Sequence, residues 1–204
     1  LQRIGRYELI ERIATGGQGT VYRARDTVLD RVVAVKVINQ PVTDDPQYLD
    51  ALQREARLAA GLDHPNITRV HDFQVEDGTA YIVMEYVPDA LDRHLQGGTR
   101  LPWQRAVEIA SQVARGLQHA HDNGVVHRDI KPQNVFLCDS DPPRAMVLDF
   151  GVAKALGGDE SVTTDLTQAG QIIGSPHYMS PEQVRGQPVR PATDIYALGL
   201  LVAE

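Results

Sequence analysis

Hydrophobic residues alternate with polar ones, or run together as β-branched clusters, through the first 85 residues of the chain. Such spacing, with valine and isoleucine enriched, is typical of β-strands. Residues 31–38 hold five valines and isoleucines, and Asp77-Gly78 is a dipeptide common in hairpin turns. The pattern predicts five strands, at residues 7–13, 20–25, 31–38, 67–74 and 79–85.

Residues 47–62 instead show the spacing of an amphipathic helix, in which apolar side chains recur every three to four positions. Leu52, Ala59 and Leu62 fall on one face of this helix. Glu55 shares that face, so a carboxylate sits within an otherwise apolar stripe.

A second helix is predicted at residues 103–123, ending at the left-handed stop Asn123-Gly124. Short strands are predicted after it, at residues 125–126 and 135–137. The apolar stripe of this helix is predicted to hold Val107, Ala110, Val113 or Ala114, Leu117 and Ala120.

Composition and charge narrow the class of protein. With 204 residues, 42% of them hydrophobic, the chain can form one large domain or two small lobes. Its net charge of -7 argues against a nucleic-acid surface built on bulk positive charge. Cys138 is the sole cysteine, so no intrachain disulfide forms, which suits a reducing compartment. No apolar run approaches the roughly 18 residues of a membrane span, so we expect a soluble chain, with an anchor outside it left open.

Oxygen-bearing side chains gather in the second half of the sequence. Within 25 residues lie Asp129, Asn134 and Asp149, with the ammonium group of Lys131 among them. Mg²⁺ prefers oxygen ligands and usually takes only one or two from protein, the rest coming from water and substrate phosphate. A phosphoryl group in transfer spreads negative charge over its oxygens, which metal ions and a nearby cation stabilise. The segment therefore indicates phosphoryl-transfer chemistry.

A glycine-rich loop, residues 14–19, separates the first two predicted strands. Because glycine has no side chain, the backbone N–H groups of such a loop can approach phosphate oxygens, although an ordinary turn has the same composition. Lys36 on the third strand would by itself be a solvated lysine, and a functional role for it requires a carboxylate partner. Glu55 is the candidate for that partner.

Together these segments resemble the protein kinase family. Residues 127–134 match the catalytic loop, with Lys131 as in the serine/threonine branch, and residues 149–151 match the metal-binding loop. Residues 33–36 resemble the strand that carries the phosphate-binding lysine. Ala14 replaces the first glycine of the G-x-G-x-x-G pattern, and we expect a slightly stiffer loop rather than lost binding.

The resemblance is strongest to the bacterial, eukaryote-like (Hanks-type) serine/threonine kinases, because of the amino-acid sequences of residues 130–134 and 178–183. It implies an α+β, two-lobed protein-kinase-like fold. Residues 1–86 would form the N-terminal lobe, a small antiparallel β-sheet plus one helix. Residues 87–204 would form a partial, mainly helical C-terminal lobe, truncated after the start of helix F. In that helix Asp194 would brace the catalytic loop.

The resemblance also implies catalytic roles. Asp129 would act as the base that accepts or orients the proton of a substrate hydroxyl, and Lys131 would neutralise the transferred γ-phosphate. Lys36 would hold the α- and β-phosphates while paired with Glu55. Glu182 would be left without the arginine that pairs with it in the family, because that arginine comes from a later helix.

The implied cofactors are ATP and Mg²⁺, with Mn²⁺ as a substitute. Asn134 and Asp149 would bind the metal, Asp149 as the principal ligand. The adenine would pair with backbone, at the Glu85 carbonyl and the Val87 N–H. The expected ATP contacts are Ile13, Ala14, Gly16, Gly17, Gly19, Val21, Ala34, Lys36, Met84, Glu85, Val87 and Phe136.

Residues 149–182 would form the activation segment of such a kinase. A phosphate adds roughly -1.5 to -2 charges and can order a segment by pairing with arginine, a role that fits Arg128. Thr167 is the leading expected autophosphorylation site, followed by Thr163 and Thr164. Ser175 would lie in the substrate-docking turn.

The implied partners are proteins with Ser/Thr hydroxyls, and a second copy of the chain in a homodimer for trans-autophosphorylation. We expect no nucleic acid and no membrane contact in this segment. The expected location is cytoplasmic, either as such or as the intracellular domain of a membrane-anchored kinase.

Two other functions remain open on the sequence. A pseudokinase or nucleotide-binding scaffold would fit Ala14 and the truncated end, but Lys36, Asp129 and the metal-binding residues are all in place. A small-molecule phosphotransferase would share the chemistry of the two aspartates. It is disfavoured by Arg128 and by the docking segment at residues 175–182, which serve peptide substrates in the family.

Overall fold

The computed structural model describes residues 2–16, 19–39, 46–140, 143–150 and 176–204. The chain divides into two compact units. The first unit comprises Leu1–Gly61 and Arg69–Tyr86, and the second comprises Leu62–Thr68 and Val87–Glu204. Residues 62–68 thus group with the second unit, whereas the sequence analysis placed all of residues 1–86 in one lobe.

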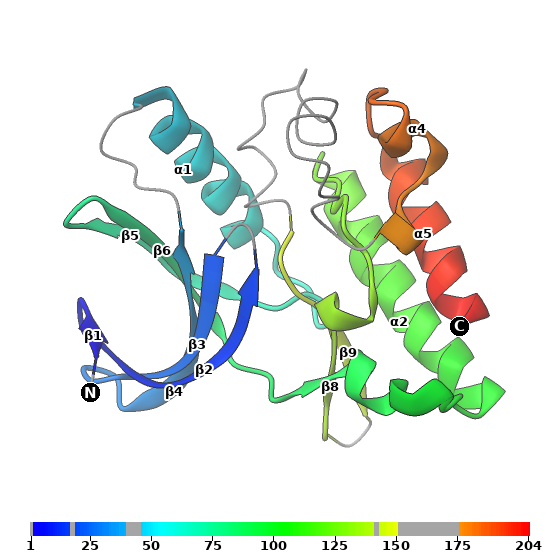
Figure 1. The fold of residues 1–204 in the computed structure, drawn as a ribbon, viewed down its shortest axis with the longest axis horizontal. Coiled ribbons are helices and arrows are strands. Elements are labelled where there is room, and N and C mark those ends of the chain that lie inside the picture. The colour runs from blue at the N-terminus through cyan, green and yellow to red at the C-terminus, as the bar shows by residue number, and fades with distance from the viewer. Residues whose placement is uncertain (1, 17–18, 40–45, 141–142, 151–175) are drawn as a thin grey trace. The chain divides into compact units, whose positions relative to one another are not determined.

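Within the described residues, the first unit is built on a six-stranded antiparallel sheet in the order β1-β2-β3-β4-β6-β5 (Figure 1). Its strands are β1 (Arg3–Ile4), β2 (Tyr7–Gly16), β3 (Gly19–Asp26), β4 (Arg31–Ile38), β5 (Val70–Glu76) and β6 (Thr79–Glu85). The register places one set of alternate side chains together in a buried cluster, which consists of Tyr7, Leu9, Ala24, Val33, Val35, Tyr81 and Val83.

Apart from end differences of one or two residues, the predicted strands agree with this sheet except at three places. The strand expected to end at residue 13 continues to Gly16, because residues 14–16 of the predicted loop pair with β3. β1 was not predicted, because two residues are too few to show a pattern. The strand expected from residue 67 begins at Val70. Ile67 instead forms an isolated parallel bridge with Val147. Both residues belong to the second unit, which includes residues 62–68.

The helix of the first unit, α1 (Pro46–Ala60), packs on β5. Leu52 and Ala59 are buried, as the predicted apolar face required, and Glu55 on that face is half-buried. Burial of this stripe against the sheet holds the helix in place, since helices of this length gain most of their stability from tertiary packing.

In the second unit, the long helices α2 (Trp103–Asp122) and α5 (Pro191–Ala203) lie side by side (Figure 1, green and red). A small antiparallel sheet, in the order β7-β8-β9, carries the segments around the catalytic loop. Its strands are β7 (Asp89–Ala90), β8 (Val135–Cys138) and β9 (Arg144–Val147). The short helices are η1 (Leu91–His94), η2 (Gln96–Gly98), η3 (Pro132–Asn134), η4 (Pro176–Tyr178) and α4 (Pro181–Val184).

The strand predicted at residues 125–126 is wrong. The Val125 N–H donates to the Ala120 carbonyl at 2.9 Å, so it closes the end of α2 and is not available to a strand. Gly124 precedes it with a φ of 75°, which supplies the predicted left-handed stop.

The buried face of α2 also differs from the predicted stripe, because Val107 is 55% exposed. A polar residue takes an inward position: the Gln112 Oε1 accepts from the Asn66 amide at 3.0 Å and from the Ala145 N–H at 2.7 Å. A buried polar group with its hydrogen bonds made is tolerated in a core, but hydrophobic spacing alone does not reveal it. The buried residues of α2 are Ile109, Gln112, Val113, Gly116, Leu117 and Ala120.

Replacing Gly116 with alanine should destabilise the chain. A Cβ at Gly116 would lie 2.9 Å from the carbonyl oxygen of Asn66, a backbone atom that cannot move aside freely. We expect a loss of about 1–3 kcal/mol of unfolding free energy, as for overpacked cores. Urea unfolding measures it.

The matched control is Gly199→Ala, because a Cβ at Gly199 in α5 would have nothing within 4 Å. Helix propensity alone should make that variant more stable, by up to about 1 kcal/mol. Equal gains at Gly116 and Gly199 would contradict the close approach of Asn66.

Candidate active site

Asp194, near the start of α5, holds the backbone of the catalytic loop as the sequence predicted. Its side chain is fully buried. Oδ2 accepts from the His127 N–H and Oδ1 from the Arg128 N–H, each at 2.8 Å, and Oδ2 lies 2.7 Å from the His121 Nε2. Such charge-assisted bonds offset the cost of burying a carboxylate, and they fix where the loop begins.

His127 orients the next part of the loop. Its Nδ1 accepts from the Asp129 N–H at 3.2 Å, and its Nε2 lies 2.8 Å from the Leu148 carbonyl, to which it must donate. These partners define the neutral tautomer with the proton on Nε2. Burial lowers the pKa of His127, which keeps the ring neutral. The ring also packs edge-on against Phe150, with centroids 4.8 Å apart.

The candidate catalytic groups of the loop are in mutual contact. The Lys131 ammonium nitrogen lies 2.8 Å from Oδ2 of Asp129. The amide nitrogen of Asn134 donates to the Asp129 carbonyl at 2.7 Å and to the same Oδ2 at 3.2 Å. The second unit therefore brings three predicted site residues together, two from irregular backbone and Asn134 from the end of η3.

Strained backbone marks both ends of this site. Arg128 has a φ of 70° and Asp149 a φ of 66°. The left-handed region is uncommon for residues other than glycine, and it clusters at functional sites where surrounding contacts stabilise it. Arg128 directly precedes the predicted proton acceptor, and Asp149 is itself the predicted principal metal ligand.

The donor set of the second unit suits a hard divalent cation. Asn134 turns its amide nitrogen toward Asp129, which leaves its amide oxygen for another partner, and Asp149 supplies a carboxylate. The Leu148 N–H donates to the Asn134 carbonyl at 2.9 Å, so the two segments that carry the predicted ligands are hydrogen-bonded to each other. In the part of the chain that the structure describes, no group of three or more His, Cys, Asp or Glu side chains could hold a metal. One amide oxygen and one carboxylate are a donor set that fits Mg²⁺, which completes its shell with water and phosphate oxygens.

The first unit presents a different set of predicted residues on one face of its sheet. Lys36 on β4 lies opposite Val21 of β3, and Ala34 lies opposite Met84 of β6. Since alternate residues share a face, these four side chains lie on the face opposite to the buried cluster. Lys36 is only 5% exposed. Its pairing with Glu55 stays a prediction.

The remaining ATP-contact candidates are spread over both units. Ile13, Ala14 and Gly16 belong to β2, Gly19 to β3 and Glu85 to β6, whereas Val87 and Phe136 belong to the second unit. A Cβ at Gly19 would collide with the Val37 carbonyl, so only glycine fits there. Outside the described residues lie the candidates Gly17, Thr163, Thr164, Thr167 and Ser175.

Glu182, which we expected to lack the arginine partner of the family, contacts a different residue. The hydroxyl of Thr193 in α5 donates to Oε1 of Glu182 at 2.6 Å. Thr193 is the third residue of its helix, and its hydroxyl also accepts from the Arg190 N–H at 3.2 Å, a capping arrangement. Pro191, at the first position of α5, is a helix-start signal in the sequence that the prediction did not use.

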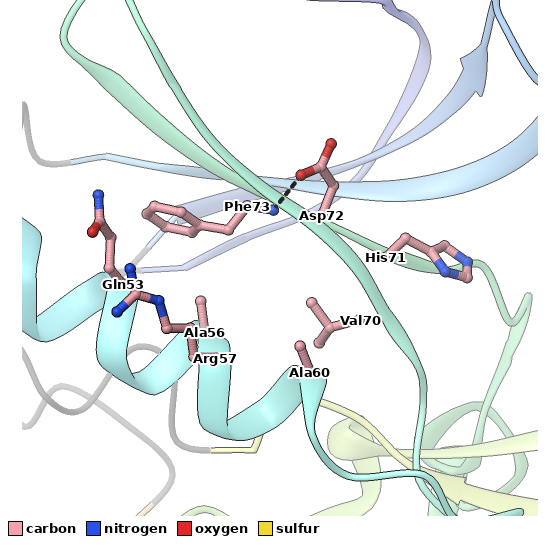
Figure 2. A pocket seen from close by; sticks show the side chains of 8 residues that line it. All are labelled: Gln53, Ala56, Arg57, Ala60, Val70, His71, Asp72 and Phe73. Atoms are coloured by element: carbon pink, nitrogen blue, oxygen red, sulfur yellow. Dashed lines mark hydrogen bonds between the residues drawn. The ribbon is translucent and has the colours of Figure 1, made fainter.

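A pocket of the first unit lies apart from the predicted site. It has a volume of about 350 Å³ and lies between α1 and β5. Figure 2 shows Ala56 and Ala60 of α1 across from Val70 and Phe73 of β5, with Gln53 and Arg57 at one side. None of the predicted catalytic, nucleotide or metal residues lines this pocket, so its presence adds nothing to the case for catalysis. His71 and Asp72 complete its lining.

No described helix combines the length and apolarity needed to cross a bilayer.

Residues 7–204 match the protein kinase domain, and the chain belongs to the protein kinase family. Two bacterial relatives named as serine/threonine-protein kinases are each 40% identical: PrkC of Bacillus subtilis over 98% of this chain, and PknA of Mycobacterium tuberculosis over 97%. The matches cover 30% of PrkC and 46% of PknA, so the chain spans less than half the length of these relatives.

A solved structure supports the fold. The crystal structure of the PknI kinase domain of Mycobacterium tuberculosis is 30% identical and aligns with a TM-score of 0.74, over 98% of this chain and 74% of that one. The kinase-like fold that the sequence predicted is thereby confirmed.

The contact between Thr193 and Glu182 predicts a pH dependence of stability. The pKa of Glu182 is lowered, chiefly because the Thr193 hydroxyl donates to the carboxylate. A carboxyl whose pKa falls on folding adds stability above its unfolded pKa, roughly 4.3, and that stability is lost as pH falls through the folded value. We expect Thr193→Val to lower the unfolding temperature at pH 6–7, with a difference from the parent chain that narrows toward pH 3.

Calorimetry at several pH values measures this difference. Thr79→Val on β6 is the control, and its difference from the parent chain should not change with pH in this range. A Thr193→Val effect of equal size at pH 3 and pH 7 would contradict the role of the ionised carboxylate.

Proposed function

We propose that this chain carries the catalytic machinery of a serine/threonine protein kinase, which transfers the γ-phosphoryl group of Mg-ATP to Ser/Thr hydroxyls of proteins. One observation carries the proposal: Oδ2 of Asp129 contacts both the Lys131 ammonium at 2.8 Å and the Asn134 amide at 3.2 Å. The relatives named as serine/threonine-protein kinases support it.

Each side chain of this cluster has a distinct part in the reaction. Asp129 accepts or orients the proton of the attacking hydroxyl, a contribution that typically reaches about 10²–10⁴-fold in rate. Lys131, held against Asp129, places a positive charge where the transferred phosphoryl group gains negative charge. Bound Mg-ATP supplies the phosphoryl donor and the metal charge, with Asn134 and Asp149 as the metal's protein ligands.

The first unit contributes to nucleotide binding in this proposal. Lys36 holds the α- and β-phosphates, and Glu55 keeps the lysine in place. The sheet face shared by Val21, Ala34 and Met84 is apolar next to Lys36, and adenine requires such a surface. The backbone of Glu85 and Val87 pairs with the adenine edge.

Regulation by phosphorylation forms part of the proposal. Arg128 directly precedes the catalytic Asp129 in the chain. A phosphate that pairs with the guanidinium of Arg128 would therefore stabilise the loop in the geometry described. A second copy of the chain would transfer this phosphate. In this proposal the protein acts in signalling, on the cytoplasmic side of the membrane.

Asp129→Asn should abolish protein phosphorylation by the full-length protein. The variant keeps the shape of the side chain but cannot take up a proton, so we expect a loss of at least about 10²-fold in the rate of transfer. The measurement is radiolabelled phosphate transfer from ATP to a generic protein substrate.

Asp122→Asn, at the exposed end of α2, is the matched control and should keep the parent rate. ATP binding without any transfer by the parent protein would indicate a scaffold instead. Labelling of small alcohols alone would indicate a small-molecule phosphotransferase.

Incubation with ATP and Mg²⁺ should place phosphate on Thr167, with Thr163 and Thr164 as secondary sites. Mass spectrometry of the protein before and after incubation locates the modified residues. The Asp129→Asn variant should remain unmodified when incubated alone. Phosphate found solely outside residues 161–167 would contradict this assignment.

A further inference from the structure

The peptide group that joins Arg128 to Asp129 is hydrogen-bonded through both of its polar atoms. The Arg128 carbonyl accepts from Nε2 of Gln183 at 2.8 Å. The Asp129 N–H donates to Nδ1 of His127 at 3.2 Å. The preceding N–H, that of Arg128, is held by Asp194. The orientation of the peptide plane next to the catalytic carboxylate is therefore set by side chains from outside the loop as well as within it.

Gln183 is well placed to fix this plane because its own amide is fixed. The side chain lies on α4 and the residue is 8% exposed. Its Oε1 accepts from the Ser180 N–H at 3.1 Å, while Nε2 faces the Arg128 carbonyl. Rotating the amide by half a turn would place Nε2 against the Ser180 N–H, two donors, and Oε1 against the Arg128 carbonyl, two acceptors. The partners therefore define a single orientation of the Gln183 amide.

Arg128 requires such support. Its φ of 70° is a conformation that a residue with a Cβ adopts only when its surroundings hold it. Because Asp194 holds the N–H of Arg128, a change of this φ to an unstrained value would rotate the Arg128 carbonyl and the peptide group that follows it. That rotation would break the Gln183 bond, and it would redirect the Asp129 side chain away from Lys131.

We propose that Gln183 is a positioning residue for Asp129: its amide clamps the Arg128 carbonyl and so couples α4 to the catalytic loop. The proposal rests on the kinase function, since the clamp matters only if Asp129 is the proton acceptor. α4 directly follows Ser180, and Glu182 on it is bound to α5 through Thr193. Displacement of this end of the activation segment would therefore release the clamp and misalign the base.

A merely structural role for Gln183 has to be distinguished, because its Oε1 also caps α4. Gln183→Glu separates the two. The glutamate keeps an oxygen for the Ser180 N–H, but when ionised it puts a second acceptor against the Arg128 carbonyl. Burial and that carbonyl both favour the neutral carboxyl, and the neutral form can again donate. Gln183→Leu removes both interactions at nearly constant volume.

The test is the kinetics of phosphate transfer by the full-length protein between pH 5.5 and 8.5. At pH 8.5 we expect both variants to lose between about 10- and 100-fold in kcat, the range typical of a misplaced catalytic group, with KM for ATP changed less than about twofold. As pH falls, the ratio of Gln183→Glu to parent kcat should rise at least about fivefold. The ratio for Gln183→Leu should stay constant.

Gln187→Glu, the same exchange at an exposed position just beyond α4, is the control and should match the parent at every pH. Parent-like kcat in both Gln183 variants, or losses that follow a lowered unfolding temperature, would overturn the assignment. So would a Gln183→Glu defect that does not change with pH.

Amide hydrogen exchange separates this proposal from the kinase function itself. In Gln183→Leu, faster exchange at the Asp129 N–H with unchanged exchange in α2 and α5 would support the clamp. This result would support it even if the parent protein transferred no phosphate. Unchanged exchange at Asp129 would overturn the clamp, whereas an inactive parent protein would overturn the kinase function alone.

Discussion

One buried carboxylate determines the geometry on which the candidate site depends. Asp194 accepts from two consecutive backbone N–H groups and contacts His121, all without exposure to solvent. Burial of a carboxyl group is costly unless its hydrogen bonds are made. The catalytic loop therefore has little freedom at its start. Arg128, whose N–H is one of the two held by Asp194, has a left-handed backbone conformation there.

The same principle of satisfied polar burial organises the core beneath the loop. Asn66 uses its amide to bind Gln112 of α2 and the Ala145 carbonyl of β9, while Gly116 lets its backbone approach the helix. Residues 62–68 are thereby fastened to the second unit, although they follow the helix of the first unit in sequence. Hydrogen-bonded polar groups thus specify which unit this segment joins, where hydrophobic contacts alone would specify it poorly.

Much of the fold and of the candidate site was accessible from the sequence. β4 and β6 have the predicted bounds, and the stop of α2 at Gly124 was correctly placed, because strand periodicity and turn residues act locally. Other features differ from the expectation because distant partners decide them. Val107 is exposed and Gln112 buried because of Asn66 and Ala145, and Glu182 is paired because Thr193 lies beside it. None of these contacts has a signature in the local spacing of residues.

By itself, the sequence determined which residue types are available for chemistry and, through their spacing, which local elements carry them. A carboxylate, an ammonium group and an amide within one short loop can be recognised from residue types because each has a characteristic charge and donor set. The resemblance to the family already implied that Asp194 holds that loop. Only the tertiary structure decided that Gln183 and His127 hold it as well, since the Gln183 contact joins residues 55 positions apart. Their role depends on hydrogen-bond geometry, which folding creates and which no pattern along the chain encodes.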